Sequence, residues 1–512
     1  ILCFVIQYSE SKINNMYQDL FANNFLLNFL TSFLFIVINI LSSYSISHDL
    51  NKKKIQFFSE LQPIIIFFLF FILYSFAFNF LILLNFYHYF NSIFFSILLI
   101  QLIFLFKNIN LLGKLNFKII KTSALEKVII IFLFIFYLIC ILPISDADSI
   151  ALHQNLANNL YLNGLENIDL NKNISSTIFS NTQSLLIISP ILKSDNFGSQ
   201  MNVIILAFFV FHNFKNHKNF VLVLFSCPLI IYFISTQKLQ LFFSILYLLI
   251  FILVNKDVIK NKLELFIITL LLVFYSSGNI SYFLFTAPLY LFFFYNQRKH
   301  WQNIILFSLI SFLIILVPIF IIKQLYFENI VAPFFDNIFG TNDLLLNAYS
   351  YSIRATEGWL SNPTSLQLYL RPFIPLSVEN LSSSLGVIFL IMLCNFNLLK
   401  KTKFFPLIII ALVLITGQIL PRYYFEAFLI MAYYFNNKNI YFKSIIFIQN
   451  LIILMIALSF VYISYISLGV LNDKSKYMNR FSYSYFNSEQ NKMSQINGNI
   501  LDFSIGRPST FY

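Results

Sequence analysis

The sequence predicts an all-α protein: a polytopic bundle of about 12 to 14 transmembrane helices, with an amphipathic surface helix and polar loops facing outward. Three observations carry this prediction. Of the 512 residues, 59% are hydrophobic and only 11% are charged, whereas soluble domains carry about 25% charged residues. Apolar runs of about 18 or more residues, long enough to cross the hydrocarbon core, recur along the chain. The lysines gather in short loops between these runs.

Each element follows from the apolar runs. The candidate spans are 23–46, 62–84, 88–107, 127–144, 199–214, 219–235, 239–254, 264–277, 280–296, 303–322, 382–399, 404–420, 422–436 and 443–469. Several are near 16 residues long, so we expect a few to tilt or to cross half of the bilayer. The chain then divides into N-terminal transmembrane helices (1–126), a core with outer loops 145–198 and 323–381 (127–436), and a last transmembrane helix with an outer polar tail (437–512).

Lysine clusters predict the orientation, because cytoplasmic loops carry an excess of Lys and Arg. If residues 107–127 are cytoplasmic, alternation of the spans places 20 of the 33 basic residues inside and 16 of the 21 acidic residues outside. The inner loops are short, so a sizeable site is expected on the outer side. The net charge of +12 therefore indicates membrane topology. We expect membrane lipids, and no nucleic acid, as partners.

The ends and the known motifs add little. The chain begins with Ile1 and its first residues resemble the tail of an earlier helix, while the last residues are polar. We therefore expect a fragment truncated at both ends. The sequence contains no P-loop, HExxH or Rossmann glycine pattern, so ATP-driven or zinc-dependent chemistry has no support from motifs.

The most informative stretch runs from Pro143 to Gly164. Asp146 and Asp148 stand where a predicted helix leaves the membrane, and a carboxylate near low dielectric requires a cation, a metal or a hydrogen-bonding partner. An amphipathic pattern follows, in which leucines recur every fourth residue, and it predicts a helix lying along the membrane surface with its leucines down. A general base, or a site for a metal-held phosphate, needs carboxylates in such a place.

Simpler interpretations stand beside these. Asp148 directly precedes Ser149 and could cap the surface helix by accepting a backbone N–H. His153 would share a face with Ser149 and Asp146 if the helix begins early, which makes it a candidate substrate contact. A lone surface histidine without any role is the alternative.

This stretch, SDADSIALH followed by LYLNG (145–164), resembles the first outer loop of the GT-C glycosyltransferase superfamily. The similarity is greatest to the bacterial branch related to protein mannosyltransferases and lipid A aminoarabinose transferase. Looser likenesses occur in three further segments, which are SSGNISYFLFTAPLYLFF (276–293), ENIVAPFFDNIFG (328–340) and LPRYYFEAFLIMAYYF (420–435). The chain departs from the pattern in three ways. Asp-Ala-Asp replaces Asp-Glu, the Lys expected near Asn279 is missing although Lys238 begins another outer helix, and the Asn-Pro dipeptide of the later loop is not intact.

The resemblance implies a donor of the polyprenyl-phosphate sugar type and an acceptor hydroxyl that an outer aspartate deprotonates. Asp146 would be this base. Asp148 would assist, either as a helper or as the ligand of a divalent metal such as Mg²⁺ or Mn²⁺, and no other cofactor is implied. The acceptor would be a lipid, a glycan or a protein.

A leaving phosphate needs positive partners. The outer basic residues near membrane ends are Lys238, Lys323, Arg354, Arg371 and Arg422. Arg422 is the first choice, since it begins a helix after Leu420-Pro421 and a charge at that depth usually has a partner. Each could instead be a snorkelling side chain at the interface. The loop 354–375 between these arginines could cover the donor or form an aromatic belt.

The sequence thus predicts a glycosyltransferase in the bacterial plasma (inner) membrane, part of the cell envelope, with its active site facing the periplasm. Two other functions are considered. An O-antigen polymerase or ligase would also use a lipid-linked glycan, and a lipid or polysaccharide transporter would place charged groups at mid-membrane. We expect the central spans to be nearly free of ionisable residues, which argues against ion-coupled transport.

Overall fold

Helices are the regular elements throughout the part of the chain that the computed structural model describes, which confirms the all-α fold class. These described residues are 25–53, 55, 57–58, 60–108, 124–144, 149–165, 178–213, 217–255, 259, 261–279, 281–332, 338, 370, 372–374, 384–415, 420–435, 440–471 and 477.

Every predicted span coincides with a helix or with two consecutive helical segments. These are α3 (Phe25–Lys52), α4 (Gln62–Leu83), α5 (Phe90–Lys107), α7 (Ala124–Ile141), α11 (Phe197–Asn213), α12 (Lys218–Phe225), α13 (Leu229–Ile234), α14 (Gln240–Val254), α15 (Lys262–Gly278), α16 (Tyr282–Asn296), α17 (Trp301–Phe327), α21 (Val387–Leu393), α22 (Phe396–Lys401), α23 (Phe405–Ile415), η6 (Pro421–Tyr424), α24 (Phe425–Tyr434) and α25 (Ile440–Tyr462). Three short segments, η1 (Tyr87–Tyr89), η4 (Arg298–His300) and η7 (Ile463–Ser467), extend some of them.

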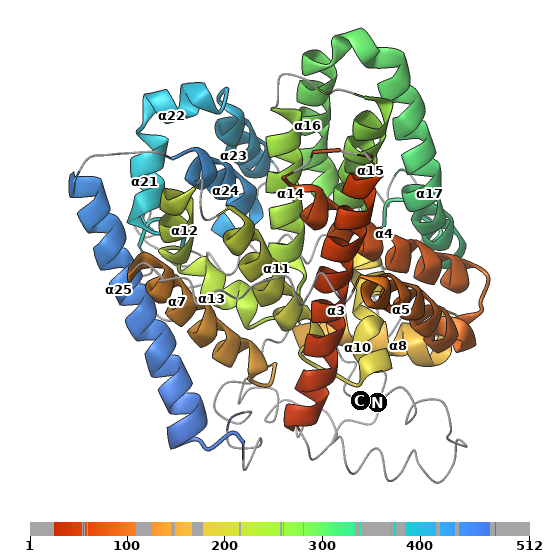
Figure 1. Ribbon diagram of the computed structural model, residues 1–512, viewed down its shortest axis with the longest axis horizontal. Helices are drawn as coiled ribbons and strands as arrows, with labels where there is room; N and C mark the ends of the chain where they lie inside the picture. The colour runs from red at the N-terminus through yellow and green to blue at the C-terminus, as the bar shows by residue number, and fades with distance from the viewer. Residues whose placement is uncertain are drawn as a thin grey trace.

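Five of the described helical segments are long and apolar enough to cross a bilayer. They are Phe29–Lys52, Gln62–Leu83, Tyr87–Lys107, Arg298–Phe327 and Tyr441–Ser467. A helix rises 1.5 Å per residue, so about 20 residues span the hydrocarbon core. The protein is therefore built as a membrane-embedded helical bundle, with shorter apolar helices packed among the long ones (Figure 1).

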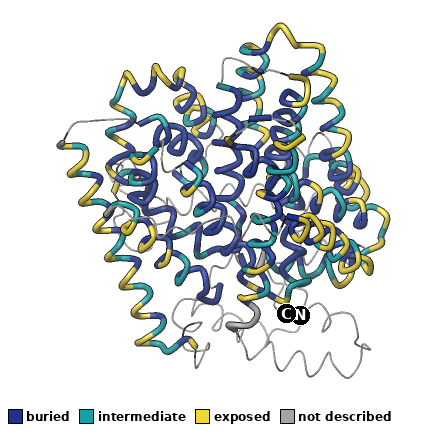
Figure 2. Tube along the Cα trace, in the orientation of Figure 1, coloured by how far each residue is buried: buried dark blue, intermediate teal, exposed yellow. Residues whose placement is uncertain are grey.

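α14 forms the centre of the bundle. All of its residues from Leu241 to Val254 are buried, as expected for a helix that is apolar on every side. It packs against α11, α13, α15, α16 and α24. By contrast α25, at the left edge of Figure 1, has many exposed apolar side chains, and Figure 2 shows its outer surface as largely exposed. Such a surface suits contact with lipid.

Two predicted spans are interrupted, and two helices were not anticipated. The span 219–235 breaks into α12 and α13 at Pro228, which lacks a backbone N–H and disfavours helical backbone at the preceding residue. The span 382–399 breaks into α21 and α22, where the Asn395 side chain accepts a hydrogen bond from the Leu398 N–H and starts a new helix. Within the loop 145–198 lie α9 (Asn181–Leu186) and α10 (Ile188–Leu192), which are largely buried.

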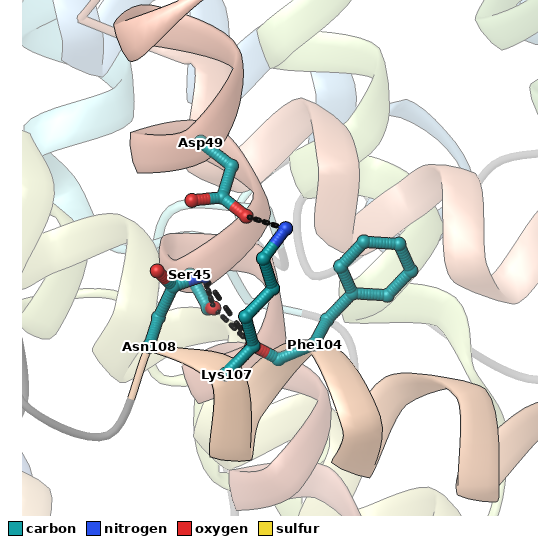
Figure 3. Close-up of polar contacts among 5 residues, drawn as sticks. All are labelled: Ser45, Asp49, Phe104, Lys107 and Asn108. Carbon is teal, nitrogen blue, oxygen red and sulfur yellow. Dashed lines mark hydrogen bonds and ion pairs between the residues drawn. The ribbon is translucent and has the colours of Figure 1, made fainter.

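The ends of α3 and α5 meet on the side of the bundle that the charge pattern predicts to be cytoplasmic. Lys107 Nζ lies 3.7 Å from Asp49 Oδ2, and Asn108 Nδ2 donates to Ser45 Oγ at 2.9 Å (Figure 3). Ser45 Oγ in turn donates to the Phe104 carbonyl at 2.7 Å. Residues 49 and 107, which the prediction places on one side of the membrane, are thus together in the fold.

His217 lies near the same end, in the loop before α12. Its ring stacks on that of Tyr433, with centroids 4.1 Å apart. Burial lowers the pKa of His217, and the positive charge of Lys401 lowers it further, although a hydrogen bond with the Tyr433 backbone acts in the opposite direction. The folded protein therefore favours the neutral imidazole.

Acidification should destabilise the protein through His217. The unfolded chain protonates this histidine near the ordinary pKa of about 6.5, and the folded protein only at lower pH, so its contribution to stability is present above that value and is lost as pH falls below it. We expect His217→Phe, which keeps the ring stacking, to flatten the decline of thermal stability between neutral pH and pH 5 in detergent. An unchanged pH profile would contradict this.

Candidate functional site

The predicted surface helix is present and follows the aspartate pair in the sequence. It consists of a π-helical turn, η2 (Ser149–Gln154), and α8 (Asn155–Asn163), and it ends at Gly164, whose φ of 61° suits glycine. Leu156 and Leu160 are buried, but they belong to the hydrophobic core of the protein, and α8 packs on η1, α9 and α10. The expectation that its leucines point down into lipid is therefore corrected for these two residues.

The start of this helix is tied to the loop that carries Lys238. Ser149 Oγ accepts a hydrogen bond from the backbone N–H of Gln237 at 3.0 Å. The Gln237 side chain accepts from the Gly198 N–H at 2.7 Å and donates to Ser189 Oγ at 3.3 Å. Ser149 follows Asp148 in the sequence, and Gln237 precedes Lys238. The residue after the aspartate pair therefore contacts the residue before Lys238, a predicted phosphate ligand.

Asn202 of α11 holds the same loop from the inside of the bundle. Its side-chain N–H group donates to the carbonyls of Phe233 at 2.8 Å and Lys238 at 2.7 Å, while its oxygen accepts from the Phe242 N–H at 3.1 Å. Asn202 is fully buried. The Asn202 amide thus satisfies three backbone groups, from the last turn of α13 to the first turn of α14. Without hydrogen bonds, these groups would cost free energy in an apolar interior.

Lys238 and Arg422 converge on one phenol oxygen. Lys238 Nζ donates to the Tyr232 hydroxyl at 2.8 Å, and Arg422 Nη1 donates to the same oxygen at 3.0 Å. Arg422 Nη2 also donates to the Tyr423 hydroxyl at 3.1 Å, with the guanidinium carbon 5.0 Å from the Tyr423 ring centroid. Two of the predicted phosphate partners, 184 positions apart in the sequence, therefore belong to one cluster. The sequence analysis missed both tyrosines, which resemble ordinary interfacial aromatics.

Two hydrogen bonds one helical turn apart fix Arg422 against α14. Gln240 Nε2 donates to the Arg422 carbonyl at 2.8 Å, and Ser244 Oγ donates to Glu426 Oε1 at 2.8 Å. The Tyr275 hydroxyl donates to the same carboxyl oxygen at 3.3 Å. Glu426 is 1% exposed. Glu426 is an ionisable residue within the predicted span 422–436, and polar groups of α14 and α15 offer hydrogen bonds that make its burial tolerable.

His153 faces a polar cluster. Its Nδ1 lies 3.2 Å from Gln183 Nε2, and Gln183 also accepts from Ser180 Oγ at 2.5 Å. Ser180 donates as well to the Gly278 carbonyl at 2.7 Å. His153 is therefore on the rim of a network that joins η2, α9 and the end of α15.

Four predicted site residues lie outside the described residues: Asp146, Asp148, Arg354 and Arg371. The possible metal ligand Asp148 is among them. Within the part of the chain that the structure describes, no group of three or more His, Cys, Asp or Glu side chains could hold a metal ion.

The Lys238–Tyr232–Arg422 cluster is rich in positively charged hydrogen-bond donors. An ammonium and a guanidinium carry only N–H donors, and a neutral phenol accepts from both without cancelling their charges. A phosphate group, with several acceptor oxygens and negative charge, matches such a set, since charge-assisted hydrogen bonds are the strong ones.

Comparison of the chain with protein-family models, with curated proteins and with solved structures finds no match.

Removing the hydrogen bond between Ser244 of α14 and Glu426 of α24 should destabilise the fold. Ser244→Ala deletes a donor to the buried Glu426 carboxyl, and we expect a loss of about 1–2 kcal/mol in the free energy of unfolding. Thermal or denaturant unfolding of the detergent-solubilised protein measures this.

Ser226→Ala is the matched control, because within the described part of the chain the buried Ser226 hydroxyl bonds only to the nearby Val223 carbonyl, at 2.7 Å. It should cost clearly less than Ser244→Ala. Equal losses for the two variants would show that the Ser244–Glu426 contact has no special weight.

Proposed function

We propose that this protein is a membrane glycosyltransferase that transfers a sugar from a polyprenyl-phosphate donor to a lipid, glycan or protein acceptor on the outer face of the bacterial plasma membrane. The observation that supports it most is the convergence of Lys238 and Arg422 on the Tyr232 hydroxyl. The tie between Ser149 and Gln237 adds to it, since it joins this cluster to the segment that follows the aspartate pair.

The reaction assigns a task to each group. The acceptor hydroxyl oxygen forms a bond to the anomeric carbon, the bond between that carbon and the phosphate oxygen breaks, and polyprenyl phosphate leaves with the bonding electron pair. Asp146 takes the proton of the acceptor hydroxyl, and Asp148 assists it, as a helper or as a metal ligand. Lys238 and Arg422 stabilise the negative charge that grows on the phosphate.

The other predicted residues have secondary tasks in this proposal. His153, at the rim of the network with Gln183, would contact the acceptor or the sugar. Arg354 and Arg371, in the predicted outer loop 323–381, would be further contacts of the donor phosphate. Membrane lipid keeps the polyprenyl chain in the bilayer, so that only the sugar phosphate has to enter the site.

The cation cluster is tested by Lys238→Gln and Arg422→Gln. Each should lower transfer about 10²- to 10³-fold, the usual effect of losing one donor to a developing charge. The donor sugar is unknown, so the assay measures release of polyprenyl phosphate, the product common to all such donors, from a panel of polyprenyl-phosphate sugars in isolated membranes.

Arg298→Gln is the matched control, because Arg298 is exposed in η4, which joins α16 to α17 on the predicted cytoplasmic side. It should retain activity. Loss of activity in all three variants, or in none, would contradict the assignment of Lys238 and Arg422 to the phosphate.

The aspartate is tested separately. Asp146→Asn should abolish transfer without changing the amount of protein in the membrane, because an amide cannot accept the acceptor proton at neutral pH. Binding of polyprenyl phosphate should persist, since the cations are intact. Full transfer by Asp146→Asn would remove Asp146 as the base.

A second candidate function, transport of a lipid or polysaccharide, is favoured by two observations. Glu426 is an ionisable group buried among the apolar helices, and two predicted spans are discontinuous, as in many transporters. Reconstituted liposomes distinguish the two functions. Movement of a polyprenyl-phosphate sugar across the bilayer without release of polyprenyl phosphate would favour transport, and release of polyprenyl phosphate would favour transfer.

A further inference from the structure

A second cluster of cations lies at the opposite end of the bundle from Arg422. Arg422 precedes α24, while Tyr434 ends it, and the turn between α22 and α23 lies beside Tyr434 at the top of Figure 1. The end of α22 and this turn contain Lys400, Lys401 and Lys403 together with the exposed ring of Phe404, and a second exposed ring, Phe396, begins α22. We call these five residues the basic-aromatic turn.

The backbone of the turn is strained, and lysines that only mark the cytoplasmic side of the membrane would not require such strain. Lys403 and Phe404 both have left-handed backbone, with φ of 54° and 57°, which costs about 1–2 kcal/mol for each non-glycine residue. The turn is held by hydrogen bonds from the Phe404 N–H to the Leu399 carbonyl at 2.8 Å and from Thr402 Oγ1 to the Leu398 carbonyl at 3.1 Å. The fold thus maintains a costly conformation that presents a lysine and a phenylalanine side by side.

Two of the lysines lie over aromatic rings. Lys403 Nζ is 4.5 Å from the ring centroid of Phe292, and Lys401 Nζ is 5.3 Å from that of Tyr434. Tyr434 is itself fixed, because its hydroxyl accepts a hydrogen bond from Asn255 Nδ2 at 3.0 Å. All three lysines remain exposed. Their ammonium groups are therefore positioned by rings of α16 and α24, yet open to the surroundings.

The exposed rings identify the kind of partner. Phe396 is 65% exposed and Phe404 39%, and Leu407 and Ile408 of α23 are also exposed. Apolar side chains of this kind belong at the boundary between headgroups and acyl chains. Cations beside them at the same level match the negative headgroups of anionic lipids. A soluble acidic partner would match the lysines but not the exposed phenylalanines.

We propose that the basic-aromatic turn is a binding site for the headgroup of an anionic phospholipid in the leaflet that it faces. Lys401 and Lys403 contact the phosphate, and Phe396 and Phe404 enter the acyl boundary. The proposal is independent of the glycosyltransferase function, since the two sites share no residue.

Binding of phosphatidylglycerol tests it. The full chain in detergent is titrated with phosphatidylglycerol and, in parallel, with phosphatidylcholine, and bound lipid is counted by native mass spectrometry. The wild type should prefer phosphatidylglycerol. Lys401→Gln/Lys403→Gln should weaken binding of phosphatidylglycerol roughly 30-fold, about fivefold for each lysine near an anionic headgroup.

Arg298→Gln/Lys299→Gln is the matched control, because it removes the same charge from exposed residues of η4, on the same predicted side of the membrane. It should leave binding within about twofold of the wild type. Equal weakening in both double variants would overturn the proposal in favour of net charge alone. Equal affinity of the wild type for the two lipids would also overturn it.

A measurement on the wild type alone guards against misfolded variants. Added salt screens charges at the protein surface, so raising the salt concentration should weaken phosphatidylglycerol binding and leave phosphatidylcholine binding unchanged. Insensitivity of phosphatidylglycerol binding to salt would contradict the proposed contact.

Discussion

The arrangement of the candidate site depends on one constraint: backbone groups that leave a helix inside an apolar bundle need hydrogen-bonding partners, because little water is present to supply them. The segment between α13 and α14 meets this constraint through Asn202, which contacts Phe233, Lys238 and Phe242. Gln237 meets it through Gly198, Ser189 and Ser149. With its backbone fixed in this way, the segment presents Lys238 toward Tyr232.

The same principle orients Arg422. The Gln240 side chain donates a hydrogen bond to the Arg422 carbonyl. Ser244 donates to the Glu426 carboxyl one helical turn further along. The helix that supplies both donors is α14, which is buried from Leu241 to Val254, so the cation cluster is anchored to the centre of the bundle. Precise placement of charge is what a site for a leaving phosphate requires, since pre-oriented donors lose little free energy by reorganising during the reaction.

The sequence predicts most of the helices and only part of the site. Apolar runs mark the spans because bilayer thickness sets their length. The interruption at Asn395 is not predicted, because a single capping side chain within an apolar run decides it. Lys238 and Arg422 are both predicted phosphate contacts, and the fold brings them to one phenol oxygen. Tyr232 is not predicted, since its contact with Arg422 forms only when α13 and η6 meet. Glu426 was hidden for the same reason: only its contacts with Ser244 and Tyr275 explain its burial. The placement of Asp146 and Asp148 stays a prediction.

An experimental structure of the protein with bound undecaprenyl phosphate tests the central claim most directly. We predict that the phosphate lies within hydrogen-bonding distance of Lys238 Nζ and the Arg422 guanidinium, and that the Asp146 carboxylate lies roughly 6–12 Å from one of these groups, which leaves room for a sugar phosphate between charge-assisted contacts. A phosphate bound elsewhere, with Lys238 and Arg422 contacting only protein, would contradict the account.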